Sequence, residues 1–158
     1  MTTETLTIRP ARSGGDVEAT RALFREYAAS LDFELCFQGF EEELEALPGD
    51  YAPPGGTLLL AEVSDEIAGC VAVRRLEDRI CEMKRLYVRP AYRGEGIGRA
   101  LAEAALDRAR ALGYARMRLD TVASMRAARA LYASIGFEET TPYYHNPLPD
   151  VVYMEREL

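Results

Sequence analysis

The N-terminal part of the chain shows two spacings of apolar residues. Residues 5–9 alternate β-branched or apolar with polar side chains, which predicts a strand that stops at Pro10. After Asp16, the expected N-cap, apolar residues recur at helical spacing and predict an amphipathic helix over 17–31. A short helix is expected over 40–47, between two loops, the second of which is rich in proline and glycine.

The middle of the chain contains three apolar, strand-like segments in quick succession. They cover residues 57–63, 67–76 and 80–88. The short polar turns SDE and EDR join them, which favours antiparallel hairpins. The third segment ends before Pro90, and a glycine-rich loop follows it.

Helices and strands alternate in the rest of the chain. Apolar residues at helical spacing predict a helix over 97–112, followed by a strand over 115–120 and a second helix over 125–135. Two further segments are expected to pair as the closing strands, residues 137–144 and 151–158. This order predicts an α/β (α+β) fold with a mixed, mostly antiparallel sheet and one parallel pairing across the helix after the glycine loop.

Composition narrows the class of protein. With 158 residues, of which 48% are hydrophobic, the chain suits a single domain over residues 1–158. A net charge of -7 argues against nucleic acid as a partner, because phosphate backbones are bound by an excess of lysine and arginine. No apolar run approaches the length of a membrane span and no targeting segment is apparent, so a cytoplasmic protein without a membrane partner is expected.

The residues that usually bind metals are few and scattered. The three cysteines, Cys36, Cys70 and Cys81, show no CxxC spacing and are expected to be buried, reduced thiols. His145 is the single histidine. No metal site is therefore expected.

The glycine-rich loop, RGEGIG at residues 93–98, invites a phosphate-binding interpretation. It lacks the G-x-x-x-x-G-K-[ST] string of nucleotide hydrolases and the G-x-G-x-x-G string of dinucleotide-binding proteins. What remains is Arg93, Gly96 and Gly98 in front of a helix, where exposed backbone amides and the helix dipole can hold a diphosphate. Taken alone, the loop could equally be a turn that lets strand and helix pack closely.

Two motifs together resemble the GNAT superfamily of N-acetyltransferases. Residues 93–98 are similar to the family's [Q/R]-x-x-G-x-[G/A] pyrophosphate loop, and ARALYASIGF is similar to its A-x-x-L-Y-x-x-x-G-F signature. Met125 stands where many members carry asparagine. The resemblance covers nearly the whole chain and implies a sheet of about seven strands flanked by about four helices, with the fourth and fifth strands splayed apart around acetyl-CoA.

The resemblance also implies which residues bind this co-substrate. Backbone groups of the fourth strand would pair with the pantetheine arm, and amides of the loop would hold the pyrophosphate, with nearby Arg89 adding charge. The expected binding residues are Leu86, Tyr87, Val88, Arg93, Gly94, Glu95, Gly96, Ile97, Gly98 and Arg99.

Two residues are the candidates for proton transfer, which the acylation of an amine requires. Tyr132 stands where the family carries the tyrosine that protonates the departing thiolate, although its helical spacing also suits a core aromatic. Glu82 stands where some branches carry a general base. Period-two alternation would place it on one face with Lys84, Leu86 and Val88, and an ion pair with Lys84 is the alternative.

The resemblance implies an acceptor site walled by the first two helices, the loop between them and the last strands. The candidates are Tyr27, Gln38, Phe40, Tyr144 and Asn146, beside Phe33, Tyr143 and His145. The expected activity is acetyl transfer to a primary amine of a small molecule or amino acid. The alternatives are acetylation of a protein N-terminus or lysine, and a non-catalytic acyl-CoA-binding module. Since family members are often dimers, a homodimer is a further expectation.

Overall fold

The computed structural model describes residues 5–31, 39–144, 146, 148 and 150–158. Its strands form one seven-stranded sheet in the order β1-β2-β3-β4-β5-β7-β6. The strands are β1 (Leu6–Pro10), β2 (Thr57–Val63), β3 (Glu66–Glu77), β4 (Ile80–Val88), β5 (Arg116–Val122), β6 (Glu138–Thr140) and β7 (Val151–Glu157). The helices are α1 (Gly14–Ser30), α2 (Phe40–Ala46), α3 (Ile97–Ala111) and α4 (Arg126–Ser134). Two short 3-10 turns, η2 (Gly49–Tyr51) and η3 (Pro90–Tyr92), complete the described elements.

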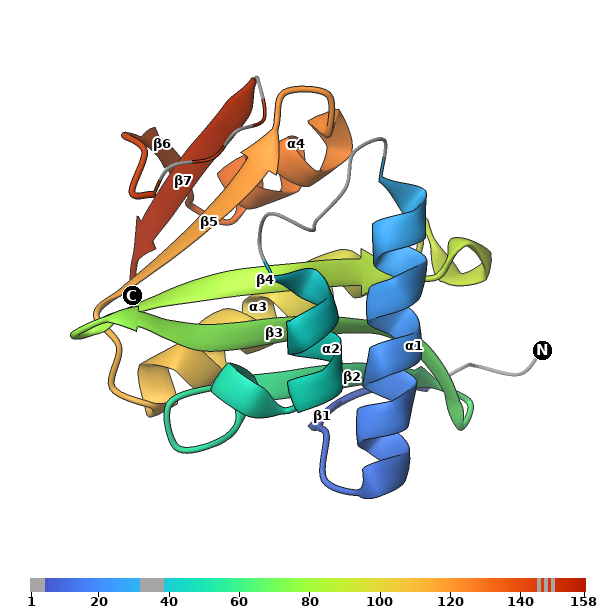
Figure 1. Cartoon of the computed structure of the whole chain (residues 1–158). Helices are drawn as coiled ribbons and strands as arrows, with labels where there is room; N and C mark the ends of the chain where they lie inside the picture. Colours follow the sequence, from blue (N-terminus) through green and yellow to red (C-terminus); the bar gives the residue numbers. More distant parts are fainter. Residues whose placement is uncertain (1–4, 32–38, 145, 147, 149) are drawn as a thin grey trace.

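The predicted fold class is confirmed. All neighbouring strands pair antiparallel except β4 and β5, which are parallel and joined through α3. Figure 1 shows α1 and α2 in front of the sheet and α3 behind it, and shows β4 and β5 diverging from their shared end. This divergence creates the gap that the splayed strands of the resemblance imply.

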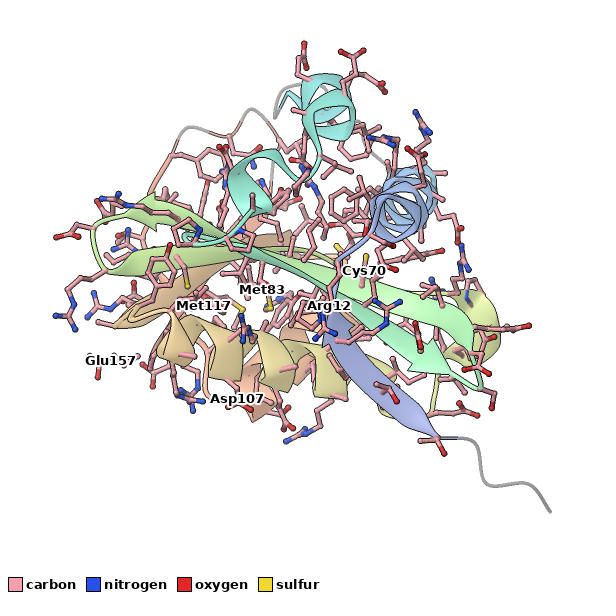
Figure 2. The ribbon with its side chains drawn as sticks, turned by 90° about the horizontal axis from the view of Figure 1, so that it is seen from below. Arg12, Cys70, Met83, Asp107, Met117 and Glu157 are labelled. Carbon is pink, nitrogen blue, oxygen red and sulfur yellow. The ribbon has the colours of Figure 1, made fainter. Side chains whose placement is uncertain are left out.

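Each face of the sheet has its own apolar core. Residues of β2, β3, β4 and β5 pack with α3 and α4 on one face, and a second cluster packs with α1 and α2 on the other. Figure 2 shows Met83 and Met117 on the α3 side and Cys70 on the α1 side. Cys70 and Cys81 are buried free thiols, as expected, and Cys36 lies outside the described residues.

The helix α1 begins earlier than its expected start. Ser13, not Asp16, is the N-cap, and the two residues form a capping box in which the Ser13 side chain accepts a hydrogen bond from the Asp16 amide. Asp16 instead binds the backbone of Ser13 and the guanidinium of Arg9. Prediction from the acidic residue alone therefore placed the cap three residues too late.

The strand expected over 137–144 is shorter in the structure. Its described strand, β6, ends at Thr140. Pro142 has no backbone N–H to donate to a neighbouring strand, and the chain turns so that Tyr143 and Tyr144 direct their hydroxyl groups to Glu82 and Asp120.

A β-bulge in β4 corrects the predicted facing of its side chains. Lys84 is paired with Ala72 and Tyr87 with Cys70, so β4 contains one more residue than β3 across this interval. Arg85, at the bulge, has a positive φ of 60°. The extra residue shifts the alternation by one position. The prediction that Glu82, Lys84, Leu86 and Val88 share one face is therefore wrong: Leu86 and Val88 pack on the α3 side, and Glu82 and Lys84 face the α1 and α2 side.

Candidate active site

A cavity of about 420 Å³ lies where β4 and β5 separate. β4 pairs with β5 only over Ile80–Glu82, whereas its pairing with β3 continues to Val88. In the described part of the chain, the edge of β4 that faces β5 thus has no strand partner over residues 83–88. Leu86, Tyr87 and Val88, which were predicted to hold the pantetheine arm, line this cavity.

The glycine loop forms one end of the cavity, called the cofactor end below. Gly94, Gly96, Ile97 and Gly98 line it. Gly94 and Gly96 have φ values of +85° and +79°, and a Cβ added to either would meet no atom within 4 Å. Gly96 is the N-cap of α3 and has no side chain to cap the first helical amides. The amides therefore face open space, which fits the diphosphate of acetyl-CoA.

The arginines near the loop have different roles. Arg93 lines the cavity, and its Nε donates to the Val88 carbonyl at 2.9 Å. Arg99 instead binds Glu103 and Ser134, and Arg89 binds Glu26. Of these three arginines, Arg93 alone lines the cavity. Arg99 and Glu95 belong to the predicted binding set, and neither side chain lines it.

The second motif, ARALYASIGF, forms the part of the cavity wall that belongs to α4. Ala128, Leu131 and Tyr132 line the cavity. Gly136 follows the helix with a φ of +98°, a backbone conformation that favours glycine. The motif therefore combines cavity-lining residues with the residue that ends the helix.

Tyr132 packs in the core and also lines the cavity. Its ring packs edge-on against Phe137, with centroids 5.9 Å apart, and belongs to the buried core. Tyr132 also lines the cavity, and its hydroxyl has no hydrogen bond to another described residue. Burial raises the pKa of Tyr132, and Tyr27 and Asp120 add to this effect. The phenol is therefore protonated at neutral pH, as a proton donor must be.

Glu82 is buried behind the cavity and does not line it. Its side chain is 1% exposed, and Arg74 donates to Oε1 at 2.8 Å while the Tyr143 hydroxyl donates to Oε2 at 2.6 Å. Glu82 forms an ion pair with Arg74, whereas the sequence suggested Lys84 as its alternative partner. Glu82 is thus linked to the cavity indirectly. It binds the Tyr143 hydroxyl, and Tyr143 packs against Tyr144, which donates to Asp120.

Asp120 is a carboxylate of the cavity that sequence reasoning missed. It lies on β5, lines the cavity and accepts a hydrogen bond from the Tyr144 hydroxyl at 2.6 Å. The Asn146 amide donates to the same Tyr144 oxygen at 2.8 Å. In the sequence, Asp120 is one polar residue at the end of a predicted strand. The divergence of β4 and β5, which no local pattern reveals, brings Asp120 to the cavity.

Two adjacent cations of β4 also line the cavity. Lys84 and Arg85 precede the predicted pantetheine-binding residues. The Arg85 guanidinium makes two hydrogen bonds of 3.0 Å to Glu43 of α2 and lies over the Phe40 ring. Burial lowers the pKa of Lys84, and Arg85 acts in the same direction, whereas Glu82 and Asp120 raise it.

The predicted acceptor residues fall into three groups. Tyr27 and Asn146 line the cavity beside Lys84 and Asp120, and we call this region the acceptor end. Phe40 and Tyr144 lie behind it, Phe40 under Arg85 and Tyr144 against Asp120. The remaining candidates lie outside the described residues: Gln38, Phe33 and His145.

The described residues contain neither a membrane span nor a metal-binding cluster. No helix among them is long and apolar enough to cross a membrane. No group of three or more histidine, cysteine, aspartate or glutamate side chains within the described ranges could hold a metal ion.

Comparisons with known proteins agree on one family. The sequence model of the Acetyltransferase (GNAT) family matches residues 20–137. An N-acetyltransferase of Schizosaccharomyces pombe, itself uncharacterized, is 42% identical over 145 residues, which cover 90% of this chain and 89% of that protein.

Solved structures share the fold. An acetyltransferase from Streptococcus agalactiae superposes with a TM-score of 0.79 at 23% identity, over 97% of this chain and 98% of that one. An N-acetyltransferase from Thermoplasma acidophilum, solved in complex with coenzyme A, gives a TM-score of 0.74 at 18% identity, over 98% and 99% of the two chains.

Proposed function

The chain belongs to the Acetyltransferase (GNAT) family and is an N-acetyltransferase that uses acetyl-CoA, and we propose that a primary amine of a small molecule or amino acid attacks the thioester directly. The observation that carries this proposal is the cavity itself. It joins the uncapped N-terminus of α3 at one end to Asp120 and Tyr132 at the other. Two substrates can therefore meet within one cavity, without a covalent intermediate on the protein.

The residues of the acceptor end suit the proton transfers. An ammonium group must lose a proton before it can attack, and Asp120 is the carboxylate that lines the cavity. As the new C–N bond forms and the C–S bond breaks, the thiolate takes the phenol proton of Tyr132, and the second proton that the nitrogen loses restores the phenol.

Glu82 takes a supporting part in this proposal. Its carboxylate holds the Tyr143 hydroxyl, and Tyr143 packs against Tyr144, with ring centroids 5.3 Å apart. Tyr144 in turn donates to Asp120. A direct role of Glu82 as general base stays a prediction, and the cytoplasmic location and the homodimer expected from the sequence stay predictions as well.

Free-thiol release tests the reaction. The protein is incubated with acetyl-CoA and a library of amines, amino acids and short peptides. We expect turnover on small amines, and we expect Tyr132→Phe to lower kcat about 100-fold, because one proton donor is lost. The affinity for acetyl-CoA, measured by calorimetry, should be unchanged.

Tyr114→Phe is the matched control. Tyr114 also packs against the core that contains Tyr132, and its hydroxyl donates to the Gly55 carbonyl, but it does not line the cavity. This variant should keep the wild-type kcat. Wild-type turnover in Tyr132→Phe would remove the acid role, and turnover on peptides alone would replace the small-molecule acceptor by a protein.

A further inference from the structure

The chain contains a single lysine, Lys84, among eighteen arginines, and this lysine lines the acceptor end of the cavity. We infer that Lys84 binds a carboxylate of the acceptor, so that the acceptor is an amino acid rather than a simple amine. This inference rests on the proposed function, since it names the substrate class of the same site.

The position of Lys84 directs it to the acceptor and not to the coenzyme. Lys84 precedes the bulge at Arg85 and is paired with Ala72, whose side chain belongs to the α1 and α2 face. Leu86 and Val88 follow the bulge and pack on the opposite face. The bulge therefore places the side chain of Lys84 on the opposite face from Leu86 and Val88, two of the three residues predicted to hold the pantetheine arm, while Tyr87 shares its face.

The neighbouring charges leave a pattern that matches an amino acid. Arg74 is bound by Glu82, and Arg85 by Glu43, so protein carboxylates already match these two guanidinium groups. Lys84, which has a contact within the protein as well, and Asp120 place one positive and one negative group on the cavity wall. An ammonium group near Asp120 and a carboxylate near Lys84 would complement both.

Lys84 can bind a ligand carboxylate even though it already has a contact within the protein. An ammonium group carries three N–H donors, and a carboxylate such as Asp120 offers about four acceptor positions. One hydrogen bond within the protein, such as that from Tyr144 to Asp120, therefore leaves capacity for a ligand. Burial of Lys84 opposes its charge, and a ligand carboxylate would act in the same direction as Glu82 and Asp120, favouring the ammonium form.

The test compares acceptors that differ only in the carboxylate. The probes are the standard L-amino acids, each measured against its carboxamide, with kcat and KM from thiol release. We expect at least one acid to be preferred over its carboxamide by about tenfold to a hundredfold in kcat/KM, mainly through KM, as for a hydrogen bond between charged groups.

Three variants test the role of Lys84. Lys84→Met should reduce the preference to about onefold while the carboxamide reacts almost as before, and Lys84→Arg should retain part of the preference. Arg75→Met is the control: Arg75 has a side chain that is 64% exposed, does not line the cavity and should leave all constants unchanged. Thermal unfolding checks that each variant is folded.

Each outcome decides the inference. Equal rates for acids and carboxamides, or a preference that survives in Lys84→Met, would overturn it while the proposed function stands. If no amine is acetylated, the proposed function fails, and calorimetric titration of the CoA-loaded protein with the amino acids decides instead. Binding that is lost in Lys84→Met supports the inference, and no binding overturns it. Peptide mapping that finds Lys84 acetylated during turnover would also overturn it, because the lysine would then be an acceptor.

Discussion

The two ends of the cavity are built in different ways. The cofactor end is made largely of backbone groups from one continuous stretch, the loop of residues 93–98 and the first turn of α3. The acceptor end is made of side chains from separate elements, among them Tyr27 of α1, Lys84 of β4 and Asp120 of β5. A continuous loop binds what is common to a family, whereas scattered side chains can determine which acceptor one member uses.

If backbone groups build the cofactor end, a side chain added to the loop should weaken acetyl-CoA binding more than any other substitution considered below. Gly96→Val adds a branched side chain at a φ of +79° over the open space above the loop. We expect the affinity for acetyl-CoA to fall about a hundredfold, or about 3 kcal/mol, as measured by calorimetry.

Gly113→Val provides the matched control for this loss. Gly113 follows the other end of α3, has a φ of +93° and faces open space as well. Its variant should lose stability to a similar extent but bind acetyl-CoA normally. Equal affinities of the two variants would show that the loop at Gly96 is a turn and not a diphosphate cradle.

If side chains build the acceptor end, Asp120, which lines it, should matter more for turnover than Glu82, which lies behind it. We expect Asp120→Asn to lower kcat about 30-fold to 100-fold, because Asp120 lines the cavity, and Glu82→Gln to lower it about tenfold or less. Glu82→Gln should also cost about 2 kcal/mol of unfolding free energy in urea, less than a fully buried pair, since the Arg74 side chain is 32% exposed. The reverse order of the kcat values would assign the base to Glu82.

The smallest expected effect is a pH dependence of stability at the acceptor end. The pKa of Lys84 is lowered in the folded protein, so its charge costs stability wherever the lysine is protonated in both states. As pH rises above the folded pKa toward about 10.4, the unfolded chain binds more protons and this cost disappears.

The difference between wild type and Lys84→Met isolates that cost. Urea unfolding should find the variant more stable at neutral pH, and its advantage should shrink as pH approaches about 10.4. Arg75→Met should show no such trend. An advantage that does not depend on pH would mean that Lys84 titrates alike in the folded and unfolded chain.

The cofactor end could be predicted because its determinants are local. The glycines at 94, 96 and 98 and the apolar spacing of α3 stand within one stretch of sequence, and the structure places them together as expected. The arginines were predicted less well. Arg99 and Arg89 are near in sequence, but each is bound by a carboxylate of a helix, which no local pattern reveals.

The acceptor end was harder to predict because its arrangement depends on pairing between distant segments. No glycine or proline marks the bulge at Arg85, so regular alternation gave Leu86 and Val88 the wrong face. The partner of Asp120 is Tyr144, 24 residues away across a turn that Pro142 sets. The bond from Tyr143 to Glu82 spans 61 residues, and it changed the expected surroundings of that carboxylate.

The bulge in β4 also bears on how such a protein can diversify. Because one inserted residue leaves Lys84 on the α1 and α2 face and turns Leu86 and Val88 toward the α3 face, substitutions on the two sides of Arg85 act on different surfaces. A gene lineage could exchange the charge at position 84 and gain a new acceptor while the segment beyond the bulge keeps its contacts. Neighbouring codons would then be subject to separate selection, one set for substrate choice and the other for retention of the coenzyme.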